Sequence, residues 1–143
     1  MSDGSDQPLG YLLYRVMSAL RSDVTSTVLD PLDLSFPQYI CLRMLTKFPG
    51  RSNAELAREM SVSPQAMNMV LRSLEQRGLV SRPSSVTAGR SLPAQLTAAG
   101  QTLLTRTDDG VRLAEQRLMS DLEPSLRREL KRMLASIGSA PDR

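Results

Sequence analysis

The chain has 143 residues, a length that suits one domain with its own core, and its 18 Lys and Arg exceed its 15 Asp and Glu, for a formal net charge of +3. It has no histidine and one cysteine, Cys41, which excludes Cys/His zinc sites, internal disulfides and histidine-based catalytic triads. There is no apolar run near the ~20 residues that span a bilayer, and no charged-then-apolar leader opens the chain. We therefore expect a cytoplasmic protein that needs no metal, no cofactor and no membrane.

Positive charge is concentrated in one part of the sequence. No acidic residue occurs between Glu75 and Asp108, an interval that contains four arginines, Arg77, Arg82, Arg90 and Arg106. Such a run is consistent with a solvated surface, and equally with a surface that binds a polyanion. The fold has to decide between these two interpretations.

The first predicted element is a long helix. From Leu9 onward, apolar residues recur at steps of three and four until Asp30-Pro31 breaks the pattern. The stripe consists of Leu12, Leu13, Val16, Met17, Leu20 and Val24.

Three shorter helices follow, and each begins at a serine. Ser35 caps a helix that Pro49-Gly50 stops. Ser52 caps a short helix that ends at Ser61-Val62, and Ser63 caps the next one, with Pro64 in its first turn and Gly78 just past its last. Two helices joined by a tight turn are typical of a helix-turn-helix.

Beyond Gly78 the pattern changes to short β-compatible segments. "LVSRP" from Leu79 and "SLPAQLT" from Ser91 flank the Ser/Thr/Gly-rich loop "SSVTAGR", which predicts a small hairpin with edge strands only, because each segment contains a proline. Thr97 then caps a long helix, which Gly100 and Gly110 are expected to weaken, and Pro124 opens a final amphipathic helix. The fold class is mainly α with a β-hairpin: six helices and a wing of two or three strands.

The helix after Ser63 has two different faces. One face is apolar and predicted to be core: Met67, Val70, Leu71 and Leu74. The other carries Gln65, Asn68, Met69 and Arg72. Gln and Asn can read an adenine edge in the major groove, and Met can contact a thymine methyl group, although the same residues also suit an ordinary polar surface.

The neighbouring hairpin favours the base-reading interpretation. Arg82 on one strand and Arg90 at the tip would place cations along phosphates or in a minor groove, as expected for a winged helix. The sequence therefore predicts a double-stranded DNA partner.

The segments "LSFPQYICLRML", "RSNAELAREMSVSPQAMNMVLRSLEQRGLVSRP" and "GRSLPAQLTAAG" resemble the MarR family of bacterial transcriptional regulators, and the resemblance extends from about Leu9 to Ile137. It implies that Ser63, Gln65, Asn68 and Met69 face the major groove and that Arg90 enters the minor groove. Where the family usually carries an aspartate that helps to fix the wing, this chain has Ala88, so we hypothesise that the wing orders on DNA.

The resemblance also implies a homodimer. It divides a single domain, residues 1–143, into dimerisation helices over 9–30 and 98–138 and a winged helix-turn-helix lobe over 35–97. The alternative is that the terminal helices only cap the lobe of their own chain, but apolar stripes of that length would otherwise stay uncovered.

Family members commonly bind phenolic or aromatic carboxylate ligands between the dimerisation helices and the DNA-binding lobe. Residues of the matching helices that could supply ring faces, hydroxyls and a cation are Tyr11, Tyr14, Arg15, Arg43 and Met44. Core packing for the tyrosines and surface positions for the arginines are the alternative. For Cys41, between Ile40 and Leu42, the alternatives are core filler and a redox switch.

The predicted function is a dimeric repressor that an aromatic or phenolic ligand releases from a pseudo-palindromic operator. A winged-helix module that binds another protein is the alternative, and it would lack the steep salt dependence of DNA binding. An enzyme is not expected, because the chain lacks histidine, a glycine-rich phosphate loop and clustered carboxylates.

Overall fold

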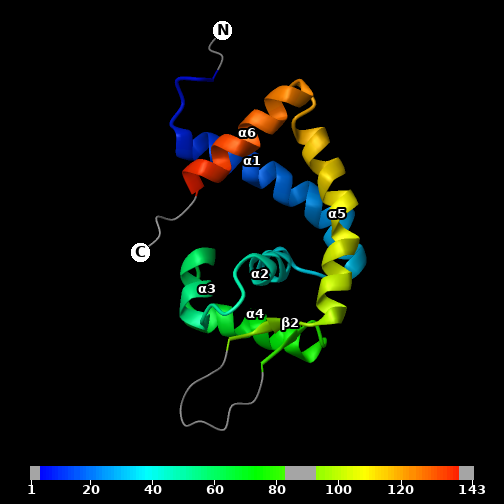
Figure 1. The fold of residues 1–143 in the computed structure, drawn as a ribbon. Helices are drawn as coiled ribbons and strands as arrows, with labels where there is room; N and C mark the ends of the chain where they lie inside the picture. Colours follow the sequence, from blue (N-terminus) through cyan, green and yellow to red (C-terminus); the bar gives the residue numbers. More distant parts are fainter. Residues whose placement is uncertain (1–3, 83–92, 139–143) are drawn as a thin grey trace.

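The computed structural model describes residues 4–82 and 93–138. Two helices, α1 (Leu9–Val24) and α6 (Pro124–Gly138), lie at one end of the molecule (Figure 1). The other end contains α2 (Phe36–Lys47), α3 (Asn53–Met60), α4 (Pro64–Gln76) and the strands β1 (Val80–Ser81) and β2 (Gln95–Leu96). The longest helix, α5 (Ala98–Leu118), connects the two ends, so the predicted six helices and small antiparallel sheet are confirmed, and the sheet has two strands among the described residues.

The first helix ends in a different way from the one expected. α1 stops at Val24 and continues as a π-helical segment, Thr25–Leu29, and a 3₁₀ turn, Asp30–Leu32. Thr27 Oγ1 donates to the carbonyl oxygen of Asp23 at 2.7 Å, and Ser26 Oγ donates to the same oxygen at 3.2 Å. These side-chain bonds compete with the regular backbone ladder, which accounts for the wider turn.

The caps of α2 and α3 are confirmed in detail. Ser35 and Gln38 exchange side-chain and backbone hydrogen bonds in a capping box, and Ser52 and Glu55 do the same. Each box satisfies two backbone N–H groups that would otherwise have no partner at the helix start. The sequence therefore defines where both helices begin.

Two glycines of α5 permit close packing. A β-carbon on Gly100 would lie 2.2 Å from the carbonyl oxygen of Leu79, and one on Gly110 would lie 2.6 Å from Val28 Cγ2. At both positions a β-carbon would fit only if the neighbouring atom shifted, and at Gly100 that atom belongs to the backbone. The expectation that these glycines weaken the helix considered only their propensity, whereas in the structure each one permits a close approach of a neighbouring segment.

Burial is unevenly distributed between the two ends. The lobe of α2, α3, α4 and the strands contains a dense core in which Leu42, Leu56, Met67, Leu71 and Leu74 are fully buried. No residue of α6 is buried, and α1 buries only Val24. Among the described residues, no helix has the length and apolar character required to cross a membrane.

Candidate nucleic-acid interface

The turn between α3 and α4 is built from three residues. Ser61 adopts a left-handed conformation (φ 54°), and the amide of Val62 donates back to the carbonyl oxygen of Ala57 at 3.0 Å. Ser63 then caps α4, its Oγ accepting from the amide of Ala66 at 3.1 Å. The predicted helix-turn-helix is therefore present, with α4 in the position of a recognition helix.

The buried side of α4 sets the helix rotation. Met67, Leu71 and Leu74 are each 0% exposed within the core, and Val70 packs against that core from its edge. On the flank, Gln38 Nε2 of α2 donates to Ser73 Oγ at 2.9 Å. Because these contacts fix the rotation of α4, they also determine which side chains it presents to solvent.

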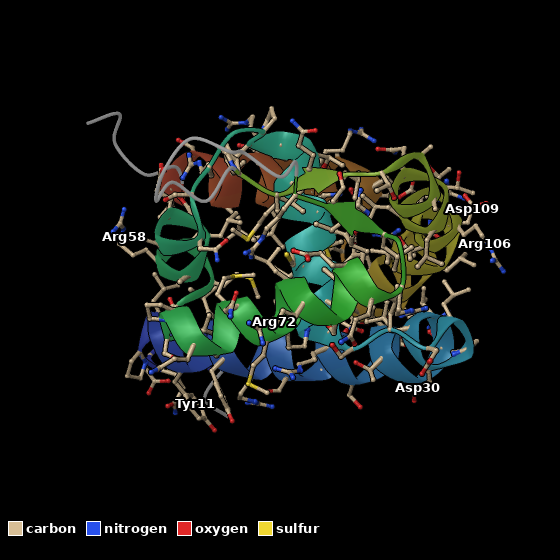
Figure 2. All side chains as sticks on the ribbon, turned by 90° about the horizontal axis from the view of Figure 1, so that it is seen from below. Tyr11, Asp30, Arg58, Arg72, Arg106 and Asp109 are labelled. Carbon is tan, nitrogen blue, oxygen red and sulfur yellow. The ribbon has the colours of Figure 1, made fainter. Side chains whose placement is uncertain are left out.

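The solvent face of α4 carries the predicted base-reading residues. Gln65, Met69 and Arg72 are exposed and Asn68 is half-buried, and Figure 2 shows Arg72 on the outer side of α4. Met69 is 72% exposed, so it makes no contribution to the core. None of these four side chains forms a hydrogen bond or ion pair with any residue that the structure describes, so their polar groups are available to a partner.

The strands after α4 form the base of the wing, which we call the wing root (residues 78–82 and 93–97). Gly78 adopts a left-handed conformation (φ 73°), and the amides of Gly78 and Leu79 close the end of α4 on Glu75 and Leu74. Val80 pairs with Leu96 in the antiparallel ladder. Residues 83–92 lie outside the described residues, so the positions predicted for Ala88 and Arg90 stay predictions.

Arg82 has partners inside the lobe. Its Nη2 donates to Asn53 Oδ1 of α3 at 3.1 Å, and its Nε lies 3.0 Å from Glu75 Oε1 of α4. The predicted direct contact of Arg82 with DNA stays untested. No sequence signal indicated that Asn53 and Glu75 contact Arg82, because Arg82 follows strand β1 and these residues lie on α3 and α4.

Arg58 is a further cation on the exposed surface of this lobe. Figure 2 shows its side chain extending away from α3. The first helix of a helix-turn-helix commonly crosses the DNA backbone, where a cation can pair with phosphate. A lone arginine at that position gave no sequence signal distinguishing it from ordinary surface charge.

The residues predicted to bind a ligand fall into two separate groups. Tyr11 and Tyr14 on α1 are 50% and 71% exposed, so neither packs in the core of this chain, and the guanidinium of Arg15 lies 5.9 Å from the ring centroid of Tyr11. On α2, Met44 packs against the core and Arg43 faces α5. Among the described residues no hydrogen bond or ring contact joins the two groups.

Arg43 contributes to a hollow of about 450 Å³ between α2, α5 and α6. Its Nη2 donates to Asp108 Oδ1 at 2.9 Å and to the Tyr39 hydroxyl at 3.2 Å. Lys131 of α6 also lines this hollow and donates to Glu115 Oε1 at 3.2 Å. Sequence reasoning missed Asp108 as a partner of Arg43, because only the fold brings α5 next to α2, whereas Tyr39 lies four residues away on the same helix.

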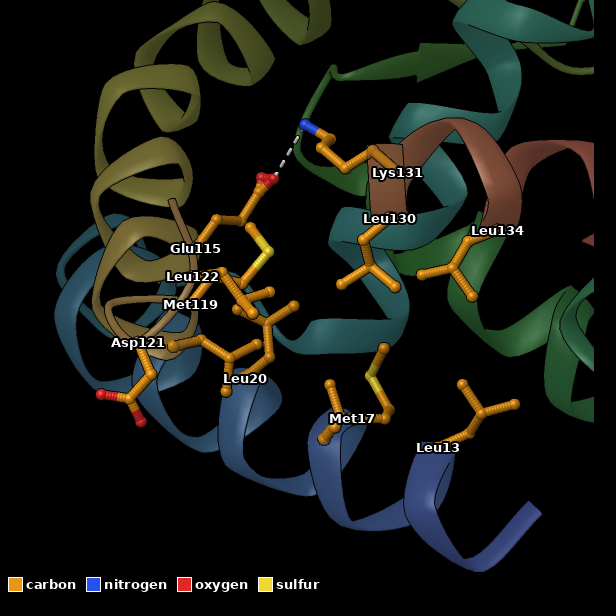
Figure 3. A pocket seen from close by; sticks show the side chains of 12 residues that line it. Leu13, Met17, Leu20, Glu115, Met119, Asp121, Leu122, Leu130, Lys131 and Leu134 are labelled. Carbon is orange, nitrogen blue, oxygen red and sulfur yellow. Dashed lines mark hydrogen bonds and ion pairs between the residues drawn. The ribbon is translucent and has the colours of Figure 1, made fainter. Parts of the chain in front are cut away.

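A second, apolar groove of about 580 Å³ lies between α1, α5 and α6. In Figure 3 the side chains of Leu13, Met17, Leu20, Leu130 and Leu134 extend toward its interior from facing helices. The Glu115–Lys131 ion pair marks one edge. The groove takes in part of the apolar surface that α1 and α6 leave uncovered, namely Leu13, Val16, Met17 and Leu134.

Cys41 lies in the core of the lobe and is 0% exposed. Burial raises the pKa of its thiol to about 12, and the nearby charge of Arg82 opposes that rise only partly. A thiol held in its neutral form is a poor nucleophile. The core position agrees with the interpretation of Cys41 as core filler.

Comparisons with known proteins agree with this arrangement. A family model described as the MarR family matches residues 32–91. The HTH-type transcriptional repressor Rv2887 of Mycobacterium tuberculosis is 55% identical over 139 residues, which cover 97% of this chain and 99% of that protein.

Two solved structures of the Mycobacterium tuberculosis protein Rv2887 share the fold. Its complex with DNA has a TM-score of 0.77 at 51% identity and covers 94% of this chain and 100% of that chain. Its complex with salicylic acid has a TM-score of 0.77 at 54% identity and covers 94% of this chain and 98% of that chain.

Proposed function

The chain belongs to the MarR family, and from this membership we propose that it is a dimeric transcriptional repressor that binds a pseudo-palindromic operator and is released by a small aromatic acid. The observation that carries the proposal is the solvent face of α4, whose polar groups have no partner within the described part of the chain although the helix itself is fixed by its core contacts. A relative that is 51% identical was solved in complex with DNA.

On DNA, α4 would enter the major groove. Gln65 and Asn68 would read base edges through their amide groups, and the exposed Met69 would contact a thymine methyl group. Arg72 would pair with phosphate, and Arg90 of the wing would contact the backbone or the minor groove. Ser63 lies at the helix start, where its Oγ already caps α4, so its hydroxyl proton and the adjacent backbone would face the groove.

The uncovered helices supply the dimer interface. α1 and α6 expose large apolar side chains, among them Leu9, Val16, Leu126, Met133 and Ile137. A monomer rarely leaves contiguous apolar surface of this kind in water, and a second copy would cover it symmetrically. Residues 9–30 and 98–138 would then form the dimerisation region, and residues 35–97 the DNA-binding lobe.

A small aromatic acid would bind where these two regions meet. Rv2887 was solved with salicylic acid and with p-aminosalicylic acid. In this chain the hollow at Arg43 combines a tyrosine hydroxyl with cations that already pair with carboxylates, so a ligand carboxylate could replace Asp108 on Arg43. Tyr11, Tyr14, Arg15 and Met44 would complete the site once a second copy brings its own α1 close.

Release would follow from a shift in population. The ligand would favour a spacing of the two α4 helices that no longer matches successive major grooves, and DNA affinity would fall. Repression of transcription in this way needs no catalytic step, so we propose that the protein is not an enzyme. A DNA-binding repressor acts in the cytoplasm of a bacterium, which is the location we propose.

Selection of bound duplexes from a random pool, repeated with salicylate and related acids, tests the whole proposal. We expect a two-fold symmetric sequence whose affinity falls when the acid is added and falls steeply with salt. A protein that retains no duplex, or binds DNA without sequence preference, would overturn the repressor function and favour a protein-binding module. Sequence-specific binding that no aromatic acid weakens would contradict only the proposed ligand response.

A further inference from the structure

Arg82 is the first residue after strand β1, and its guanidinium contacts both helices of the helix-turn-helix. Nη2 donates to Asn53 Oδ1 at 3.1 Å, and Nε lies 3.0 Å from Glu75 Oε1. Asn53 begins α3 and Glu75 lies in the last turn of α4. One side chain therefore joins three elements at the wing root.

These contacts are shielded from water. The Arg82 side chain is 23% exposed and that of Glu75 is 35% exposed, and the paired atoms Arg82 Nε and Glu75 Oε1 are themselves buried. Their geometry is that of an ion pair rather than of a hydrogen bond. Attraction between charges is stronger in such a setting than at the surface, and removal of one partner leaves the other charge without compensation.

Arg72 provides the contrast. It is exposed on the outer face of α4 and has no ion pair within the described residues, as expected for a side chain that meets a phosphate. Arg82 lies close enough to the buried Cys41 for its charge to influence the pKa of that thiol. The two arginines therefore occupy different environments, although both flank the same recognition surface.

We propose that Arg82 is a positioning residue for DNA binding: it fixes the wing root against α3 and α4 and does not itself contact a phosphate. The inference rests on the proposed DNA-binding function and assigns a role within that site. A guanidinium suits this role because its planar group has several donors and can reach two acceptors at once. A lysine keeps the positive charge, but its three donors share one nitrogen, so it does not reproduce the planar fork whose separate nitrogens meet Asn53 and Glu75.

The test measures operator affinity over a salt series for the full-length protein and four variants. Arg82→Lys keeps the charge and loses the two-nitrogen fork. Arg106→Lys is its matched control, because Arg106 is exposed on α5 and lies outside the proposed DNA contacts. Glu75→Gln removes the acidic partner, and Asp109→Asn is its control, since it makes the same change of charge at an exposed pair on α5. The fraction of protein competent to bind is titrated for each variant, so that unfolded protein is not counted as weak binding.

We expect Arg82→Lys to weaken operator binding by about tenfold or more and Arg106→Lys by less than about threefold. The Arg82 variant should keep the wild-type slope of log affinity against log salt, because no phosphate contact is lost. Glu75→Gln should also weaken binding, whereas a simple charge effect predicts tighter binding. Retained affinity in Arg82→Lys, or tighter binding by Glu75→Gln, would overturn the positioning role.

Hydrogen exchange in the free protein gives a readout that needs no DNA. Arg82→Lys should speed exchange at Ser81 and Gln95, the hydrogen-bonded pair of the ladder, while leaving α1 and α5 unchanged. Equal exchange in variant and wild type would contradict the inference even if DNA affinity falls. Failure of the wild-type protein to bind any duplex would instead overturn the proposed function, and the exchange result would still show whether Arg82 fixes the wing root.

Discussion

Arg117 and Asp23 form a two-bond ion pair between α5 and α1, although 94 residues separate them. Arg117 Nε donates to Asp23 Oδ2 at 2.9 Å and Arg117 Nη2 donates to Oδ1 at 2.8 Å. The hydrogen bonds from Arg117 lower the pKa of the Asp23 carboxyl, and partial desolvation opposes them. This pair links the helix that leads into the DNA-binding lobe to the helix that leads out of it.

The Asp23–Arg117 pair predicts a pH-dependent stability. A carboxyl group whose pKa is lower in the folded state stabilises the fold above its ordinary value of 3.8, and that stabilisation is lost as the pH falls through the folded-state pKa. Asp23→Asn should therefore lower Tm near neutral pH, and the difference from wild type should shrink below pH 3.8. Thermal melts at fixed protein concentration check this. Asp109→Asn, at a more exposed pair, should have little effect at either pH.

Gly100→Ala should destabilise the protein by about 1–3 kcal/mol, because the new methyl group must displace the backbone of Leu79. Urea unfolding of the free protein measures the change. Gly10→Ala is the matched control, since a β-carbon there meets nothing within 4 Å and should be neutral or stabilising by up to about 1 kcal/mol. Equal midpoints for both variants would contradict the close packing of Gly100.

Asn68→Ala should weaken binding to an operator with the matched base pair by about 1–3 kcal/mol and change binding to random DNA little, if the amide reads a base edge. Competition binding with operator duplexes changed one position at a time would locate that pair. Loss of affinity to the same extent on every duplex would mean that Asn68 does not read sequence.

Arg90→Ala should weaken binding to operator and to random duplexes to a similar extent. It should also reduce the slope of log affinity against log salt by about one, because a phosphate contact releases counterions. Affinity measured between low and physiological salt provides the slope. An unchanged slope with a loss restricted to the operator would mean that Arg90 reads sequence and does not pair with phosphate.

Cys41 should resist thiol reagents in the folded protein. With burial raising its pKa to about 12, labelling by iodoacetamide at pH 8 should be at least about a hundredfold slower than in urea, because only the thiolate reacts. Mass spectrometry after timed labelling gives both rates. Rapid labelling of the folded protein would reopen the redox interpretation of this residue.

Much of the fold could be predicted because the signals that start and end its helices are local. Ser35, Ser52, Ser63 and Thr97 each accept a hydrogen bond from the first turn of the helix that they precede, and Gly78 ends α4, as the sequence predicts. The apolar period of α4 likewise identified its buried side. Local chemistry of this kind needs no knowledge of distant segments.

The rest depends on contacts between segments far apart in the chain. Nothing near Arg82 indicates that Asn53, 29 residues earlier, is its partner. The hollow at Arg43 likewise exists only because α5 brings Asp108 to it, 65 residues later. The residues predicted to bind a ligand were chosen from the resemblance to the family and not from a local sequence pattern. Within the described part of one chain, no hydrogen bond or ring contact joins the group on α1 to the group on α2.

The contact of Gly100 with Leu79 has a mechanical consequence. It places the start of α5 in direct contact with the wing root, so that a tilt of α5 about this contact would move its far end relative to the DNA-binding lobe. With 21 residues at ~1.5 Å each, α5 is roughly 30 Å long, so a tilt of about 5° moves its far end by about 3 Å. A displacement of about 3 Å at the far end of α5 would therefore correspond to a change of about 5° in the angle at which α4 is presented.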